Sequence, residues 1–255
     1  MEARIQKIIS QWGIASRREA EEMIKQSRVQ INGTLAHLGQ KVDPQTDTIY
    51  VDGKPICAEQ RPSLIYLLLH KPAGVVSTCY DPQGRTTVLN LLPPQLQNGS
   101  GIHPVGRLDA ESTGALILTN DGDLTFALTH PRHNISKTYH VVVKGHPPEK
   151  ILKMWRKGVL LAGRQTRPAK VRLIEELATH SKLEIILQEG RNRQIRRVAE
   201  QLGYPVYQLH RIAIGSIELQ TPKTRFSLGV GEYRHLTPEE IIFLKNQIKR
   251  ISIND

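Results

Sequence analysis

The chain has 255 residues, of which 39% are hydrophobic, so it is long enough for one large domain or for a small domain plus a medium one. Its net charge of +11 and pI near 9.8 favour a polyanionic partner such as nucleic acid. The sequence has no 18-residue apolar run, no signal peptide, and two cysteines without metal-ligand or disulfide spacing, so we expect a cytoplasmic protein with no membrane role and no metal.

The first 60 residues are expected to form a compact module. Isoleucines at positions 5, 8 and 9 have helical spacing, and Ser16-Arg17-Arg18-Glu19 is a capping box that starts a second helix. Short strands separated by turn residues follow, over 29–31, 34–35 and 48–51. A linker at 57–63 ends the module, so we predict domains over 1–60 and 61–255.

From residue 64 onward, apolar runs and helix signals alternate in an α+β pattern. Strands are expected over 64–69, 115–118, 139–144, 169–174, 183–188 and 209–215. Helices are expected over 88–92, 121–128, 148–157 and 192–202, and one more starts at Thr237-Pro238.

Basic residues are concentrated in the second half of the chain. Residues 1–60 hold eight basic and eight acidic residues, whereas residues 132–211 hold seventeen basic and six acidic ones. The attraction for a polyanion should therefore be strongest around residues 191–211.

One polar cluster lies just before the buried strand expected at 115–118. It contains the charged pair Arg107 and Asp109, which follow Gly106. A charge at the rim of a core needs a partner, and a structural pair in a turn is the simplest interpretation. Three further segments change that interpretation, namely Lys137-Thr138-Tyr139, the run from Glu189 to Arg197, and the run from Leu209 to Gly215.

In this order the four segments resemble the signature of the pseudouridine synthases, specifically the bacterial ribosomal RNA branch with RsuA, RluB, RluE and RluF. The first 60 residues resemble the alpha-L RNA-binding domain of a small-subunit ribosomal protein, through Ile14 to Arg18, Arg28-Val29 and Ile31 to Gly33. Ser27 stands where that domain usually has glycine, which implies strain if its φ is positive. The resemblance implies an α+β fold, with the small N-terminal domain followed by a catalytic domain whose mixed, largely antiparallel sheet has a central cleft.

The resemblance also implies a reaction and three catalytic residues. The enzyme would isomerise a uridine of ribosomal RNA to pseudouridine without a cofactor, as an intramolecular transferase. Asp109 would be the catalytic carboxylate, and attack at C1′, addition to the uracil ring and abstraction of the 2′ proton all stay open. Arg196 would pair with Asp109, a choice among four neighbouring arginines that rests on the motif alone. Tyr139 would stack on the flipped uracil and transfer a proton at C5.

The remaining site residues are expected to contact RNA. Arg107 would fill the space left by the flipped base or bind its phosphate, and Leu209 would be an apolar wall, although it could equally be strand core. A solvated helix face is the alternative for the N-terminal arginines, and the histidines at 103, 130, 133 and 210 are expected to be loop residues or polar RNA contacts. The expected backbone contacts are Arg191, Arg193, Arg197, Arg211, Arg17, Arg18 and Arg28.

Two ribosomal subunits compete as the source of the substrate. Residues 119–122 and 189–193 are most similar to the RluB-like members, which favours 23S RNA, whereas Pro131-Arg132-His133 and Lys137-Thr138-Tyr139 are equally similar to the small-subunit member, which acts on 16S RNA. A non-catalytic RNA-binding or ribosome-assembly factor is disfavoured because Asp109, Tyr139 and Arg196 are all present. We expect a monomer whose partner is ribosomal RNA or an assembly intermediate.

Overall fold

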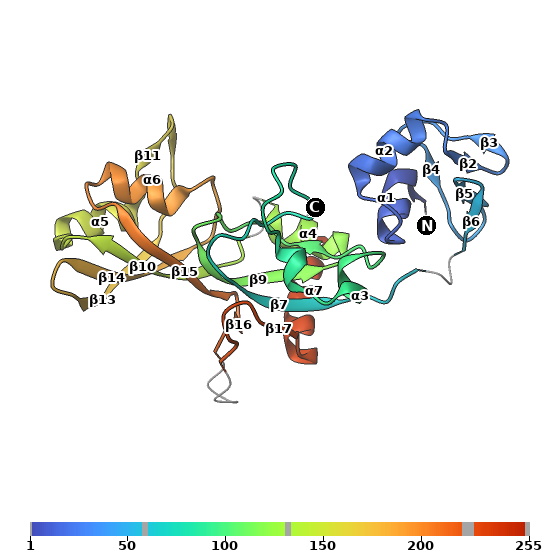
Figure 1. Ribbon diagram of the computed structural model, residues 1–255. Helices are drawn as coiled ribbons and strands as arrows, with labels where there is room; N and C mark the ends of the chain where they lie inside the picture. Colours follow the sequence, from blue (N-terminus) through green and yellow to red (C-terminus); the bar gives the residue numbers. More distant parts are fainter. Residues whose placement is uncertain (1, 58–60, 131–133, 221–226, 253–255) are drawn as a thin grey trace.

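The protein consists of a small N-terminal unit and a larger unit built on one long sheet (Figure 1). The computed structural model describes residues 2–57, 61–130, 134–220 and 227–252, with side chains as far as 247. Residues 58–60 of the expected linker and the segment Pro131-Arg132-His133 lie outside the described residues. In the described ranges, no helix is both long and apolar enough to cross a membrane.

The N-terminal unit packs two helices, α1 (Ile5–Gln11) and α2 (Arg17–Lys25), with small sheets. Ser16 caps α2 as expected, because its hydroxyl accepts from the Glu19 amide while the Glu19 carboxylate accepts from the Ser16 amide. Ser27, which stands where the related domain usually has glycine, has φ +59° and so takes the left-handed conformation that glycine favours. The strands are β1 (Ala3–Arg4) paired with β4 (Lys41–Val42), and a sheet in the order β3 (Thr34–Leu35), β2 (Val29–Ile31), β5 (Ile49–Val51), β6 (Lys54–Ile56).

The larger unit is organised by a nine-stranded mixed sheet, as the fold class predicted. Its main path runs β13 (Lys170–Glu176), β14 (His180–Leu187), β10 (Lys137–Lys144), β15 (Val206–Ile214), β9 (Thr113–Thr119), β7 (Tyr66–Lys71), β17 (Tyr233–His235). Two short strands pair off this path, β8 (His103–Pro104) with β9 and β16 (Ile217–Glu218) with β15. Among the named pairs in the described residues, β9 and β15 are parallel and the others are antiparallel.

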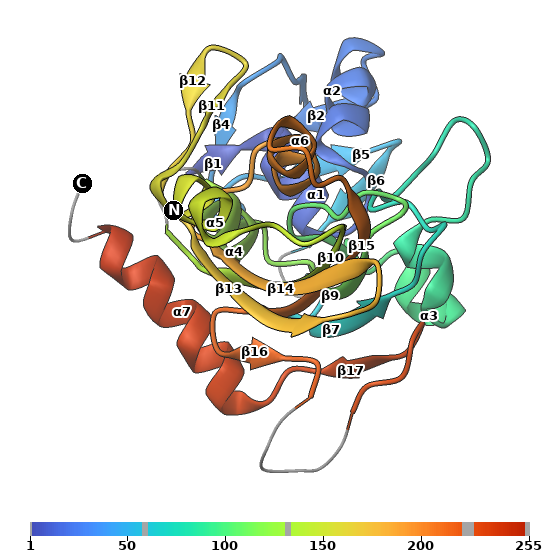
Figure 2. The ribbon, with the colours of Figure 1, turned by 90° about the vertical axis from the view of Figure 1, so that its left-hand side faces the viewer.

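The helices cover different parts of this sheet (Figure 2). On the half built by β10, β13, β14 and β15, α5 (Glu149–Lys157) and α6 (Gln194–Gln201) bury one face. On the other half, α4 (Gly122–Thr129) and α7 (Pro238–Ser252) cover one face, while the 3₁₀ turn η2 (Val88–Leu91), followed by α3 (Pro94–Gln97), covers the opposite face. Strands β7 and β9 are therefore apolar at successive positions, as expected for strands buried on both sides.

Among the differences from the sequence-based expectation, two concern the start of α6 and an additional hairpin. The helix expected from residue 192 begins at Gln194, because Arg193 takes the left-handed conformation with φ +49°. A hairpin that was not expected joins β11 (Leu160–Leu161) to β12 (Arg164–Gln165). Its turn residues Ala162 and Gly163 both have positive φ, and alanine is not a residue that signals such a turn.

The two units contact each other at a point where the backbones approach too closely for any residue other than glycine. A Cβ on Gly13, which has φ +71°, would lie 2.3 Å from the carbonyl oxygen of Gly99. Beside this contact the Lys7 ammonium is 2.7 Å from an Asp123 carboxylate oxygen on α4. The Trp12 indole also donates to the Cys57 carbonyl at 2.8 Å, which anchors the start of the connecting segment on the N-terminal unit.

We expect Gly13→Ala to loosen this contact between the units. The left-handed backbone makes any alanine there costly by roughly 1 kcal/mol, and the clash with Gly99 adds to that cost. Gly33→Ala is the matched control, because Gly33 has φ +79° but open space around its Cβ position. Small-angle X-ray scattering should show a larger radius of gyration for Gly13→Ala alone, and equal radii for the two variants would contradict the prediction.

Candidate active site

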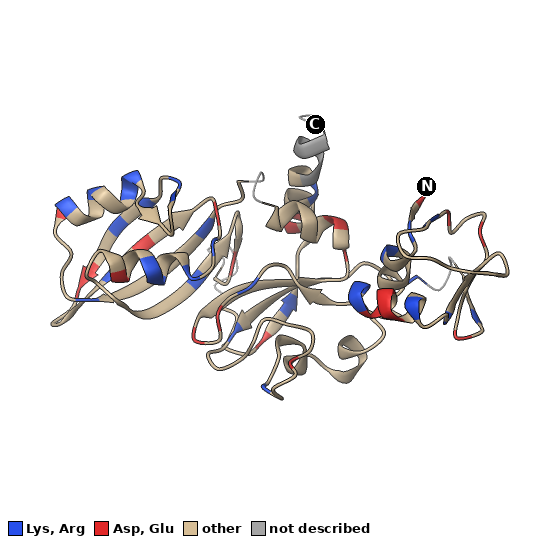
Figure 3. Ribbon diagram, turned by 90° about the horizontal axis from the view of Figure 1, so that it is seen from above, with Lys and Arg blue, Asp and Glu red and all other residues tan. Residues whose placement is uncertain are grey.

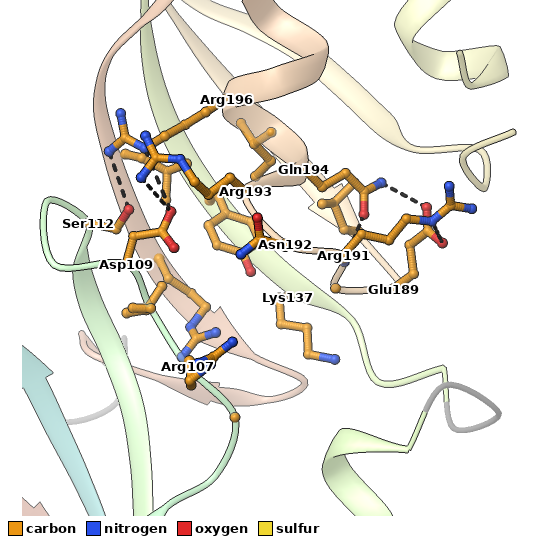
Figure 4. A pocket seen from close by; sticks show the side chains of 18 of the residues that line it. Arg107, Asp109, Ser112, Lys137, Glu189, Arg191, Asn192, Arg193, Gln194 and Arg196 are labelled. Carbon is orange, nitrogen blue, oxygen red and sulfur yellow. Dashed lines mark hydrogen bonds and ion pairs between the residues drawn. The ribbon is translucent and has the colours of Figure 1, made fainter. Parts of the chain in front are cut away.

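A cavity of about 760 Å³ opens where α6, the β11–β12 hairpin and the parallel pair β9–β15 meet. Figure 4 shows its lining side chains from close by. The acidic lining residues are Asp109 and Glu189, and the basic ones are Arg107, Lys137, Arg164, Arg167, Arg191, Arg193, Arg196, Arg197 and Arg211. Lysines and arginines also recur along the half of the sheet that carries α5 and α6 (Figure 3), so the cavity would attract a polyanion.

Asp109 lies on the loop between β8 and β9, with its side chain 31% exposed at the cavity wall. The loop is fixed on both sides of this residue. The Ser77 hydroxyl donates to the Leu108 carbonyl at 2.8 Å and accepts from the Leu108 amide at 3.1 Å, and the Ser112 amide donates to the Asp109 carbonyl at 3.0 Å. The carboxylate is thus held on a braced segment, as a preorganised reacting group requires.

Lys71, at the end of β7, also stabilises the loop that carries Asp109. It is fully buried, and its ammonium donates to the carbonyls of Pro72, Ala110 and Ser112 at 2.7, 3.2 and 2.8 Å. Burial lowers the pKa of Lys71 to about 8, although the Asp109 charge acts in the opposite direction. Lys71 was not among the predicted site residues, and its only signal in the sequence is its place as a lysine at the end of an apolar strand.

Two guanidiniums approach Asp109 from the start of α6 (Figure 4). Arg193 Nη1 lies 3.7 Å and Arg196 Nε 3.9 Å from the same carboxylate oxygen, and Arg196 Nη2 donates to Ser112 Oγ at 3.3 Å. The Arg196 side chain is 13% exposed, compared with 44% for Arg193. Arg196 is therefore the more buried of the two arginines near Asp109. The two distances are nearly equal, so they do not single out Arg196 as the partner of Asp109, whereas the sequence motif did.

Tyr139 and Leu209 form an apolar part of the cavity wall. Tyr139, on β10, is 9% exposed and belongs to a buried cluster that includes Leu209 on the adjacent strand β15. Leu108, on the loop that carries Asp109, belongs to the same cluster. Nearby, burial lowers the pKa of Lys137 to about 8, and the Arg211 charge adds to this shift. The wall combines one aromatic ring with aliphatic side chains, a composition suited to a flat apolar ligand.

The parallel pairing places β15 directly beside the Asp109 loop. Gly114 pairs with Arg211, and a Cβ at Gly114 would lie 2.2 Å from the Arg211 carbonyl oxygen. Arg211 is 4% exposed and donates to the Ala115 carbonyl at 2.7 Å. One step along, Thr113 bonds to His210 at 2.8 Å, and burial lowers the pKa of His210 to about 4, so this histidine is neutral near pH 7.

Arg191 supports the hairpin beside the cavity. Its guanidinium donates to the backbone carbonyls of Arg164 and Gln165 and contacts the Glu189 carboxylate. Glu189 also accepts from Gln194 at 2.7 Å and from the Arg167 amide at 2.9 Å. These contacts give Arg191 a clear structural role, and its expected contact with RNA stays a prediction.

The structure brings together part of the predicted residue set. Asp109, Tyr139, Arg196, Arg107, Arg191, Arg193, Arg197, Leu209 and Arg211 all line one cavity. The N-terminal arginines lie elsewhere: Arg17 and Arg18 are exposed on α2, and Arg28 makes a two-bond ion pair with Asp52 at 2.7 Å. His103 bonds to Thr125, and no group of three or more His, Cys, Asp or Glu suited to a metal ion occurs in the described ranges.

Comparisons with known proteins give consistent results for both units. Residues 65–201 match the family described as RNA pseudouridylate synthase, and residues 3–49 match the S4 domain. The chain is 39% identical over 241 residues to ribosomal large subunit pseudouridine synthase B of Bacillus subtilis, covering 93% of each. It is 36% identical to the protein of the same name from Pseudomonas aeruginosa, covering 96% of this chain and 62% of that protein. A crystal structure of a pseudouridylate synthase superposes with a TM-score of 0.64 at 31% identity, over 94% of this chain and 99% of the other.

Proposed function

The chain belongs to the RNA pseudouridylate synthase family, and from this premise we propose that it isomerises a specific uridine of ribosomal RNA. We further propose 23S RNA as the substrate, because relatives with the name ribosomal large subunit pseudouridine synthase B match nearly the whole chain. The observation that supports the proposal most strongly is the carboxylate of Asp109, which lies on a braced loop in a cavity whose charged lining residues are mostly basic.

The reaction is balanced without any added reactant. The bond from N1 of uracil to C1′ breaks, the base turns, and a bond from C5 to C1′ forms. The hydrogen on C5 is lost to solvent, and N1 gains a proton. We propose that Asp109 acts at the sugar or the base, that Arg196 keeps it charged and oriented, and that Tyr139 stacks on the uracil.

RNA contacts follow from the same proposal. The target nucleotide must leave its stack to enter a cavity of this kind. Arg107, which lies on the same loop as Asp109 and lines the cavity, would take the vacated position or bind the displaced phosphate. Arg193 and Arg197 at the start of α6 would bind neighbouring phosphates, and Leu209 would contact the edge of the base.

The release of hydrogen from C5 gives a direct test. Ribosomal RNA transcribed with tritium at C5 of uridine should release tritium to water when the purified protein is added. Large-subunit and small-subunit transcripts should be assayed separately, and the modified position should be mapped in RNA from cells with and without the gene. Release from the small-subunit transcript alone would overturn the 23S assignment, and release from neither would overturn the reaction.

We also propose that residues 1–60 position the substrate and contribute little to the general attraction for RNA. That segment is net neutral, so removing it should leave most of the salt dependence of binding in place. Discrimination between the correct RNA context and an unrelated RNA should fall more. Titrations of both RNAs at several salt concentrations measure the two effects, and loss of most of the salt slope on truncation would contradict the proposal.

A further inference from the structure

Glu111 makes a second set of ion pairs with the arginines that face Asp109. One of its carboxylate oxygens lies 3.5 Å from Arg193 Nη2 and 3.8 Å from Arg196 Nη1. Its side chain is 67% exposed, whereas that of Arg196 is 13% exposed. The two guanidiniums therefore bridge two carboxylates, one at the cavity wall and one largely in solvent.

These four groups are in contact but not tightly bonded. All four distances, from 3.5 to 3.9 Å, exceed the roughly 2.7–2.9 Å of a charge-assisted hydrogen bond. Arg196 Nε is buried and has no hydrogen-bond partner in the described structure. A buried donor without a partner is unfavourable, so the cluster has donor capacity for a further anion.

Within the described residues, the interactions of Glu111 are these two ion pairs. It makes no hydrogen bond there to the loop backbone, which is fixed by Lys71 and Ser77. An exposed side chain with such weak tethers can move at little cost. Its position on the arginines is therefore explained by charge and not by a role in supporting the loop.

We propose that Glu111 occupies, in the free protein, the place that a phosphate of the RNA takes on Arg193 and Arg196. Carboxylate and phosphate oxygens are alternative acceptors for the same guanidinium donors. On binding, the phosphate displaces Glu111 into solvent, while Arg196 keeps its contact with Asp109. Glu111 thereby weakens binding of any RNA strand and favours those that bring a phosphate into this one position. The inference rests on the proposed function, in that the displacing ligand is RNA.

Glu111→Gln tests this proposal, with Glu175→Gln as the matched control. Both substitutions remove one exposed carboxylate, but Glu175 lies on β13, outside the cavity lining. The probes are an eight-residue oligouridylate and a ribosomal RNA fragment that contains the target uridine. Glu111→Gln should bind both about two- to fivefold more tightly, the range expected for an exposed ion pair, with a steeper dependence on salt. Glu175→Gln should bind like the wild type, and its turnover at saturating RNA should be unchanged.

Several outcomes would overturn the proposal. Glu111→Gln could bind no more tightly than Glu175→Gln, or could bind more weakly, which would show that Glu111 orients the arginines for RNA. Glu111→Ser, whose shorter side chain does not reach the guanidiniums, should repeat the gain in affinity if the carboxylate is a competitor. Turnover by the wild type is measured in parallel, so its absence counts against the proposed reaction, while the affinities for oligouridylate still decide the role of Glu111.

Discussion

Asp109→Asn should abolish isomerisation while changing RNA affinity less than tenfold, or about 1.4 kcal/mol. The substitution removes the charge and keeps the volume, so the braced loop should stay in place. Arg107, Arg191 and Arg197 remain in the cavity lining to attract RNA. Release of C5 hydrogen and RNA titration measure the two properties on the same preparation.

A second carboxylate provides the control for this variant. Glu200→Gln makes the same chemical change at an exposed position on α6 and should leave turnover intact. If purified Asp109→Asn still turned over measurably, beyond any deamidation back to aspartate detected by mass spectrometry, Asp109 would not be the catalytic carboxylate.

Arg196→Met and Arg193→Met should differ in kind. Arg196 is the more buried partner of Asp109, so its loss leaves a poorly compensated charge in the cavity. The rate at saturating RNA should fall about a hundredfold, the lower end of the effect of removing one electrostatic contact to a reacting group. Turnover at saturating RNA and RNA titration on the same preparation separate the effect on the rate from any effect on binding.

Arg193→Met should mainly affect binding. Its side chain is half-exposed and lies close to the carboxylates of Asp109 and Glu111. A half-exposed guanidinium is accessible to a phosphate of the RNA backbone, so we expect Arg193 to act in binding. We expect weaker binding to all RNA sequences and a salt slope flatter by about one unit. If both variants weakened binding and left the rate at saturating RNA unchanged, Arg196 would not be the partner of Asp109.

The elements and the residues of the motifs could be predicted because their signals are local. The capping box at Ser16 and the cap at Asp121 have spacings that directly satisfy helix amides, and the helices begin where those spacings predict. Asp109, Tyr139 and Arg196 were identified by motif, and the structure brings them to one cavity.

The residues that were missed act through contacts that no local pattern contains. Lys71 is bonded to carbonyls 39 and 41 residues away, so its burial depends on the fold of the whole sheet. Glu111 is an unremarkable acid in the sequence until α6 brings two guanidiniums to it. Arg28 was expected to contact RNA. The pairing of β2 with β5 brings Asp52 next to it, and the two side chains form an ion pair that the sequence does not reveal.

The parallel pairing of β9 with β15 also determines when the cavity can form during synthesis. The bond between Thr113 and His210 closes a loop of 97 residues, whereas the N-terminal unit is built from contacts within its first 57. Long closures of this kind are slow compared with local contacts, and domains fold in order as the chain emerges. A nascent chain therefore acquires its N-terminal unit early and has no cavity until β15 has left the ribosome, so an incomplete chain lacks the site at which we propose that the reaction takes place.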